Sequence, residues 1–320
     1  MKPINILIII ALVTLLILSI SPYLGLNVAD ADIQHHILTQ LRLPRVLFAF
    51  VAGAGLALCG MVFQAMFHNP LATPFTLGVA SGASLGAAIY VYLGFSFTLL
   101  GLDGGAFAAF IGALIAISFV YSISRYQNGF SPETLLLTGV AISFFFSSLI
   151  LFTQYLSNLT DSFQILRWLM GSLTTVGYRD ILQLLPFVSI CVAAILWLTR
   201  ELNLLMAGDD IALSRGVPVQ HIRYSLFFVT SLCVGAIVAL CGPIGFIGMM
   251  VPHICRLLIG SDHRWLAPAS LLFGGSFLIV CDTISRLIIA PAEIPVGVIT
   301  TLLGGPFFLW LLIKSRSKGA

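Results

Sequence analysis

Charged side chains are scarce in this chain, and those that could bind a partner stand at the ends of long apolar segments. Arg42 and Arg45 precede one such segment, and Arg286 lies near the end of another. A guanidinium can hold a carboxylate through two parallel hydrogen bonds, which fixes the orientation of a partner as well as attracting it. Arg42 and Arg45 therefore form a basic collar where a partner could dock, and anchoring to lipid headgroups is the competing explanation. Asp282, four residues before Arg286, shares its helix face and is expected to orient it.

Motifs of catalysis are almost absent. The sequence contains no GxxxxGK[ST] loop for ATP phosphates and no HExxH zinc motif. The segment Gly82–Gly86 matches GxSxG, but it lies in an apolar run of small residues. Close helix packing explains that run better than a nucleophilic Ser84 does. We expect no enzymatic activity in this chain, with an intramembrane hydrolase as the weak alternative.

The residues that commonly bind metals are dispersed along the sequence. The six cysteines lie inside apolar segments without a CxxC spacing, and small buried hydrophobic side chains are the simplest explanation. A redox or metal-binding role is the weaker alternative for them. The histidines stand near segment ends or in the adjacent pair His35-His36, which suits interfacial or capping roles better than a shared ligand site. No metal site and no cofactor of this chain are predicted.

The composition indicates a membrane protein. Of the 320 residues, 59% are hydrophobic and 8% are charged, whereas soluble domains carry about 25% charged residues. A chain of this size could not bury so much apolar surface in water, so the bilayer is the expected solvent. The net charge of +3 is spread over many loops, which excludes the basic stripe of a nucleic-acid-binding protein.

Apolar runs of about 20 residues, the length that crosses a bilayer, predict an all-α fold with ten transmembrane helices. The first is interpreted as a retained span because no clear signal-peptide cleavage site follows it. Ten of the 15 Lys and Arg residues fall on the side of the two termini, so both termini are expected in the cytoplasm. The predicted spans are residues 4–24, 46–66, 75–94, 105–124, 133–155, 181–199, 224–242, 244–259, 266–289 and 296–313.

Two of the predicted spans share a motif. Residues 53–60 read GAGLALCG and residues 235–242 read GAIVALCG, which agree at six of eight positions. The two spans run in opposite directions in the predicted topology. Transporters often contain such inverted repeats, so an inverted internal repeat is predicted. The alternative is that helices packed through Gly and Ala resemble one another by composition alone.

Ordered blocks along almost the whole chain carry a resemblance to one family. They are Arg42-Leu43-Pro44-Arg45, Asn69-Pro70-Leu71-Ala72, Trp168-Leu169-Met170-Gly171-Ser172-Leu173, Leu202-Asn203-Leu204-Leu205, Gly208-Asp209, Arg215-Gly216-Val217, Gly242-Pro243-Ile244-Gly245-Phe246-Ile247-Gly248, Val251-Pro252-His253-Ile254 and Glu293-Ile294-Pro295-Val296-Gly297-Val298. With these blocks the chain resembles the FecCD-type permease subunits of ABC importers for iron-siderophores, haem and cobalamin. The resemblance implies one transmembrane permease domain over residues 1–320, in the inner membrane of a bacterium, with cytoplasmic termini.

The resemblance also implies partners and the residues that contact them. Two ATP-binding subunits would bind inside, a substrate-binding protein outside, and a second permease subunit, the same chain or a homologue, alongside. ATP and Mg would bind to the ATPase and not to this chain. The family likeness assigns docking of the binding protein to Arg42, Arg45 and Arg286. A cytoplasmic coupling segment, residues 201–223, would contact the ATPase through Ala207, Asp209, Ala212, Leu213 and Gly216. The fifth span would line the translocation path with Ser143, Phe145, Ser147, Ser148 and Phe152.

Part of the coupling segment can also be read from its residues alone. Asp209 and Asp210 suit the first turn of a helix, Gly216 suits its end, and Pro218 follows.

The function that the resemblance implies is import of an iron(III)-siderophore, with haem or cobalamin as the alternative cargo. An ion-driven secondary transporter is the alternative from another class. The lack of acidic residues at mid-membrane depth, Asp282 being the nearest case, weakens it.

Overall fold

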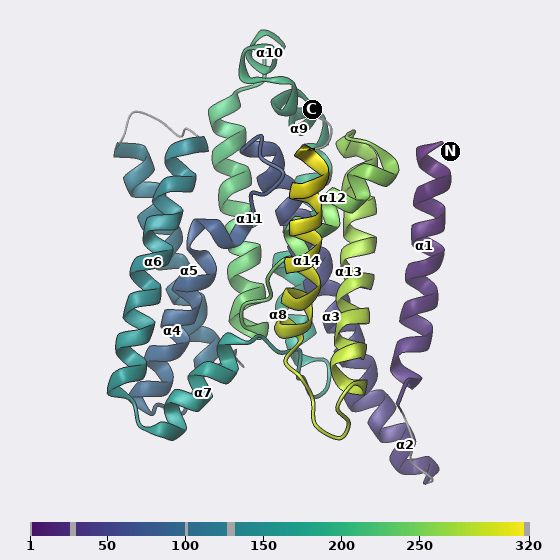
Figure 1. Cartoon of the computed structure of the whole chain (residues 1–320), viewed down its shortest axis with the longest axis vertical. Helices are drawn as coiled ribbons and strands as arrows, with labels where there is room; N and C mark the ends of the chain where they lie inside the picture. The colour runs from purple at the N-terminus through teal and green to yellow at the C-terminus, as the bar shows by residue number, and fades with distance from the viewer. Residues whose placement is uncertain (1, 26–29, 100–101, 127–131, 317–320) are drawn as a thin grey trace.

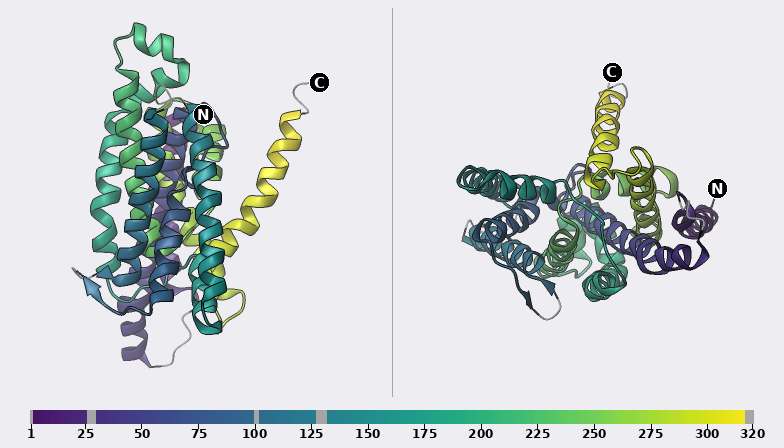
Figure 2. Two further views of the ribbon diagram at one scale, coloured as in Figure 1. Left: turned by 90° about the vertical axis from the view of Figure 1, so that its left-hand side faces the viewer. Right: turned by 90° about the horizontal axis from the view of Figure 1, so that it is seen from below.

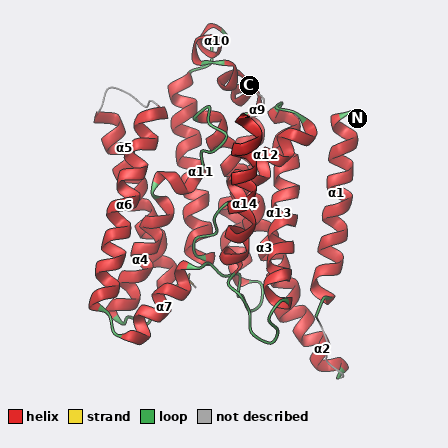
Figure 3. Cartoon of the chain, viewed as in Figure 1, coloured by secondary structure: helices red, strands yellow, loops and turns green. Residues whose placement is uncertain are grey.

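The computed structural model describes residues 2–25, 30–99, 102–126 and 132–316, and most of these are helical (Figure 1 and Figure 3). Seven helices in the described residues are long and apolar enough to cross a membrane. Three shorter apolar stretches, Val79–Leu93, Ile247–Ile259 and Val296–Leu311, accompany them. The seven long helices are α1 (Pro3–Ile20), α3 (Leu43–Met66), α5 (Gly104–Tyr126), α6 (Pro132–Leu156), α8 (Arg179–Trp197), α11 (Val219–Cys241) and α13 (His263–Leu287).

The shorter stretches lie on α4 (Val79–Leu93), α12 (Ile247–Ile259) and α14 (Val296–Arg316). Each predicted span therefore overlaps an apolar helix, and the all-α membrane fold is confirmed. The number of membrane crossings stays a prediction because three of the stretches are short. The predicted span 75–94 is interrupted: a 3₁₀ turn, η3 (Pro74–Leu77), precedes α4, and Gly78 between them has a φ of 76°. That backbone conformation favours glycine, which has no Cβ to clash.

Short elements cap both ends of the bundle. At the end where α1 begins and α14 ends lie α9 (Thr199–Ala207) and α10 (Asp209–Ser214) (Figure 1). At the opposite end lie α2 (Ala31–Ile37) and α7 (Leu159–Leu169). The remaining elements are η1 (Ser21–Tyr23), the π-helical turn η2 (Leu38–Arg42), and the antiparallel strands β1 (Thr98–Leu99) and β2 (Leu102–Asp103). The two strands are local and leave the fold class unchanged.

Helix α3 is the centre of the bundle. It contacts α8, α11, α12 and α13, and nearly all of its side chains are buried. Small residues make this possible, since helices in lipid associate mainly by close van der Waals packing. A Cβ on Gly53 would lie 2.4 Å from the carbonyl oxygen of Gly274 in α13. A Cβ on Gly60 would lie 1.8 Å from the carbonyl oxygen of Gly248 in α12. Gly53 and Gly60 are thus explained by backbone-to-backbone contact, and the inverted repeat stays a prediction.

Two helices stand at the margin of the bundle. Helix α14 leans away from the other helices (Figure 2, left), and its large side chains Leu302, Leu309 and Ile313 are exposed. Helix α6 packs on α4 and α5 but exposes Phe144, Phe145, Leu151, Phe152 and Tyr155. Both helices therefore present apolar faces that the described chain does not cover.

Gly60→Ala is expected to destabilise the protein, because the added methyl group meets the backbone of α12 rather than a side chain that could rotate away. Overpacking of this kind costs about 1–3 kcal/mol. The measurement is thermal unfolding of the purified chain in detergent. Gly305→Ala is the matched control, since a Cβ there has no atom within 4 Å. Equal melting temperatures for the two variants would contradict the packing of α3 on α12.

Candidate partner-binding sites

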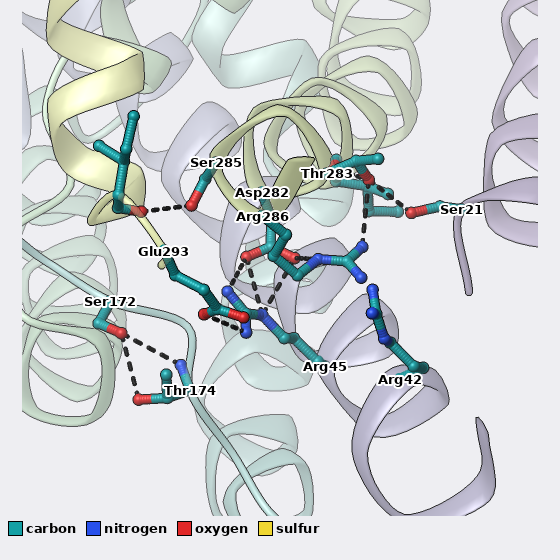
Figure 4. A network of polar contacts seen from close by, with 12 residues as sticks. Ser21, Arg42, Arg45, Ser172, Thr174, Asp282, Thr283, Ser285, Arg286 and Glu293 are labelled. Carbon is teal, nitrogen blue, oxygen red and sulfur yellow. Dashed lines mark hydrogen bonds and ion pairs between the residues drawn. The ribbon is translucent and has the colours of Figure 1, made fainter. Parts of the chain in front are cut away.

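A buried carboxylate organises the end of the bundle opposite α10. Asp282, on α13, is 1% exposed and is held by Arg45 from the first turn of α3. Nε of Arg45 donates to Oδ1 and Oδ2 of Asp282 at 2.9 and 3.1 Å, and Nη2 lies 2.8 Å from Oδ1 (Figure 4). A charged group is stable in such surroundings only when it is paired and hydrogen-bonded. The pair therefore joins α3 to α13 at this end.

Two further charges complete the group. Glu293, in the loop between α13 and α14, accepts a hydrogen bond from Nη1 of Arg45 at 2.8 Å and remains 42% exposed. Nε of Arg286 donates to Oδ2 of Asp282 at 3.1 Å, as the four-residue spacing predicted. The side chain of Arg286 is only 4% exposed, and its Nη1 has no partner among the described residues. We call Arg45, Asp282, Arg286 and Glu293 the carboxylate–guanidinium cluster.

The three arginines predicted for docking lie at one end of the bundle but differ in accessibility. Arg42 is partly exposed and donates weakly to the carbonyl oxygens of Leu24 and Gly25, at 3.3 and 3.4 Å. The guanidinium group of Arg45 is paired with Asp282 and Glu293, and Arg286 is buried. A docking residue must be accessible to its partner, and Arg286 is not, because its pairing with Asp282 buries it. The docking role itself stays a prediction.

The short helix predicted in the coupling segment is present as α10, and its contact with an ATPase stays a prediction. It begins after Gly208, whose φ is 121°, and ends before Gly216, whose φ is 77°. Asp209 in its first turn lies 2.7 Å from Nη2 of Arg223, a buried residue of α11. The backbone N–H of Val217 donates to the carbonyl of Ala212 at 3.0 Å. These contacts fix α10 to the start of α11.

The predicted contact residues of this segment are not all on its surface. Ala207, Leu213 and Gly216 are exposed, Leu213 at 58%. Ala212 is 0% exposed, so its side chain packs inside the segment and cannot form a contact surface as predicted. Its neighbour Ile211, which was not predicted as a contact residue, is exposed and extends the apolar tip. On so short a helix the spacing alone did not show which side faces the bundle.

Polar contacts that the sequence did not predict hold α9, and with it α10, to the bundle. The carbonyl of Leu205 lies 2.7 Å from Nε2 of His68, just after α3. Nδ2 of Asn203 donates to Asp262 at 2.7 Å, and Oδ1 of Asn203 accepts from the backbone N–H of His263 at 2.9 Å. The backbone N–H of Arg264 and the amide of Asn203 hold the pKa of Asp262 below its ordinary value. Asp262 therefore stays ionised and keeps its cap on α13.

The side chains proposed to line a path lie on α6. Phe145, Ser147, Ser148 and Phe152 are exposed, and Ser143 is partly buried. The hydroxyl groups of Ser143 and Ser148 donate to the helix's own carbonyls, those of Gly139 and Phe144, at 2.8 and 3.0 Å. Their hydrogen bonds are thus satisfied, and the face is mainly apolar. It points out of the bundle, so one copy of the chain does not enclose it.

Comparison with known proteins identifies this arrangement. The FecCD transport family matches residues 4–314. The chain belongs to the FecCD transport family. The Yersinia pestis protein named hemin transport system permease protein HmuU is 40% identical over 294 residues, covering 91% of this chain and 87% of that protein. The Escherichia coli O9:H4 (strain HS) protein named vitamin B12 import system permease protein BtuC is 40% identical over 283 residues, covering 87% and 83%.

A solved structure shares the whole fold of this FecCD permease. It is described as an inward-facing conformation of an ABC transporter of metal-chelate type. The two chains have a TM-score of 0.87 and 32% sequence identity, with 97% of this chain and 99% of that chain covered. The chain is accordingly a multi-pass membrane permease of an ABC importer, and ATP hydrolysis in such systems is carried out by partner subunits.

Asp282→Asn is expected to be strongly destabilising, because it leaves Arg45 and Arg286 without their shared buried counter-charge. Breaking a buried ion pair from one side costs about 3–5 kcal/mol. Glu293→Gln should cost at most about 1 kcal/mol, since that carboxylate is partly solvated. Thermal unfolding in detergent measures both. Asp103→Asn, an exposed acid outside the cluster, is the control. A Glu293→Gln effect as large as that of Asp282→Asn would contradict this ranking.

Proposed function

We propose that this permease imports a bulky metal chelate, an iron(III)-siderophore, from a substrate-binding protein into the cytoplasm. The observation that carries the proposal is the separation of two polar sites. The carboxylate–guanidinium cluster and Arg42 lie at one end of the bundle, and α10 lies at the other (Figure 1). A transporter driven by a separate ATPase needs such an arrangement. One partner delivers the cargo on one side of the membrane, and the ATPase supplies the energy of ATP hydrolysis on the other side.

The end that carries Arg42 is proposed to face outward and to receive the binding protein. Arg42 is the arginine best able to meet an acidic residue there, because among the described residues its side chain donates only to two carbonyl oxygens, both at long distances. Arg45 could exchange Glu293 for a carboxylate of the partner, since Glu293 is partly exposed. Rim charges mainly set association rate and orientation. Arg286 then serves indirectly, by holding Asp282 beside Arg45.

The end that carries α10 is proposed to face the cytoplasm, with both termini. The tip formed by Ile211 and Leu213 supplies an apolar surface for a cleft of an ATP-binding subunit. The Asp209–Arg223 pair would pass movement of α10 to α11, which packs on α3, α5 and α8. Two ATPase subunits would each engage one such segment if two permeases pair. Lipid of a bacterial inner membrane would surround the complex.

A second permease, this chain or a homologue, is proposed to cover the exposed faces of α6 and α14. Phe145 and Phe152 with Ser147 and Ser148 would then line a shared path. An apolar wall with satisfied hydroxyl groups suits a large chelate that must pass without being retained. Haem is the second candidate cargo, favoured by the resemblance to the hemin permease, and cobalamin follows from the resemblance to the vitamin B12 permease.

Uptake by the complete complex tests the cargo. The chain is purified with the ATPase and binding protein that accompany it, reconstituted into liposomes, and offered an iron(III)-siderophore, haem and cobalamin. We expect ATP-dependent uptake of the siderophore, reduced in Arg42→Glu because an attractive contact becomes repulsive. Arg286→Glu is unsuitable, since it would disrupt the buried cluster. Uptake of haem alone would favour the second candidate, and uptake driven by a proton or sodium gradient without ATPase would contradict an ABC importer.

A charge exchange tests the α10 to α11 connection. Asp209→Arg and Arg223→Asp should each reduce ATP-driven uptake severalfold. Either change replaces the ion pair with two like charges beside the buried position 223. The double variant should recover part of the loss, since coupling between contacting residues is about 0.5–3 kcal/mol. Asp210→Arg, an exposed acid beside the pair, is the control. Additive losses in the double variant would contradict direct pairing.

A further inference from the structure

Three cysteines from three helices converge in the interior of the bundle. Cys59 lies on α3, Cys191 on α8 and Cys233 on α11, and their Sγ atoms all lie within 4.8 Å of one another. Each residue is at most 1% exposed. No metal site was expected from the sequence, because residues so far apart in the chain give no spacing signal. The other three cysteines are buried but do not belong to this group.

The separations suit a metal ion bound by three sulfur atoms. A metal–sulfur bond is about 2.3 Å, so three sulfur atoms around one ion in a plane lie about 4.0 Å apart. Sγ of Cys59 and Sγ of Cys191 are 3.7 Å apart, and the third sulfur atom lies within the 4.8 Å limit. Small side-chain adjustments therefore suffice to place all three at bonding distance from a common centre.

The ligand set selects the class of ion. No imidazole or carboxylate of the described residues joins the group, so only thiols are offered. The carbonyl oxygen of Thr230, 3.6 Å from Sγ of Cys59, is a hydrogen-bond acceptor for that thiol. Structural zinc almost always takes four ligands. Thiol ligands alone select soft ions, and monovalent copper accepts low coordination numbers.

Binding of an ion to the three thiols releases protons. The site lies among apolar side chains, where a net charge is costly. A cysteine binds a metal ion as the thiolate. Each sulfur–copper bond that forms with Cu(I) therefore breaks one S–H bond, and the proton leaves to solvent. One thiolate balances the charge of Cu(I), and each further thiolate adds a negative charge that apolar surroundings make costly. Neither an oxidant nor a reductant is required for this step.

We propose that Cys59, Cys191 and Cys233 form a binding site for monovalent copper that ties α3, α8 and α11 together. The site is separate from the carboxylate–guanidinium cluster and from α10. It depends on the convergence of three helices and not on the cargo of the transporter, so it stands whether or not the proposed chelate is correct.

Copper retention by the full-length chain tests the proposal. The protein is expressed with added copper, purified in detergent under reducing conditions, and exposed to a Cu(I) chelator that strips surface-bound ions. We expect about one copper per chain, and at least a tenfold loss in Cys59→Ala, Cys191→Ala and Cys233→Ala. Cys241→Ala and Cys281→Ala are matched controls, because they remove buried thiols outside the group and should retain the copper.

Three results would overturn the proposal. They are wild-type protein that retains no more copper than Cys59→Ala does, control variants that lose copper as fully as the cluster variants, and a coordination shell that contains nitrogen or oxygen. The shell is measured by X-ray absorption at the copper edge on the wild-type protein. It is expected to contain sulfur only, and this measurement decides the matter even where a cluster variant fails to fold.

Discussion

Close approach of backbones along α3 is the constraint on which the rest of this permease depends. In lipid the hydrophobic effect does not drive helices together. Helix association therefore depends on close packing of small residues and on polar pairs at the helix ends. Helix α3 supplies both. Gly53 and Gly60 bring it against α13 and α12, Arg45 at one end binds Asp282, and Gln64 at the other end accepts a hydrogen bond from Arg256 at 3.0 Å.

This arrangement lets one helix connect the two polar ends of the molecule. Movement of α10 would reach α11 through the Asp209–Arg223 pair, and α9 is held to the end of α3 by His68. At the other end, Arg45 joins α3 to α13 and to the loop that carries Glu293. Helix α10 and the end that carries Asp282 are thus both connected to the same packed core. The exposed faces of α6 and α14 lie outside that core, where a second subunit could cover them.

The sequence was most informative where the signal is local. Apolar runs located the helices to within a few residues, and Asp209 with Gly216 marked the ends of α10, because span length and helix termini are encoded by neighbouring residues. Contacts between distant residues were missed. Arg286 was expected at the surface and is buried by its ion pair, Ala212 was expected in an interface and packs inward, and the three converging cysteines gave no sequence spacing. Each of these depends on which helix face meets which neighbour.

Labelling from one side of the membrane tests the central claim, that the Asp282 end and α10 face opposite compartments. Gln34→Cys on α2 and Leu213→Cys on α10 place exposed thiols at the two ends, while the native cysteines are buried. A membrane-impermeant maleimide applied to the outer face of intact membranes should label the variant at position 34 and leave that at position 213 unlabelled until the membrane is opened. Equal labelling of both variants from the outer face would contradict the account.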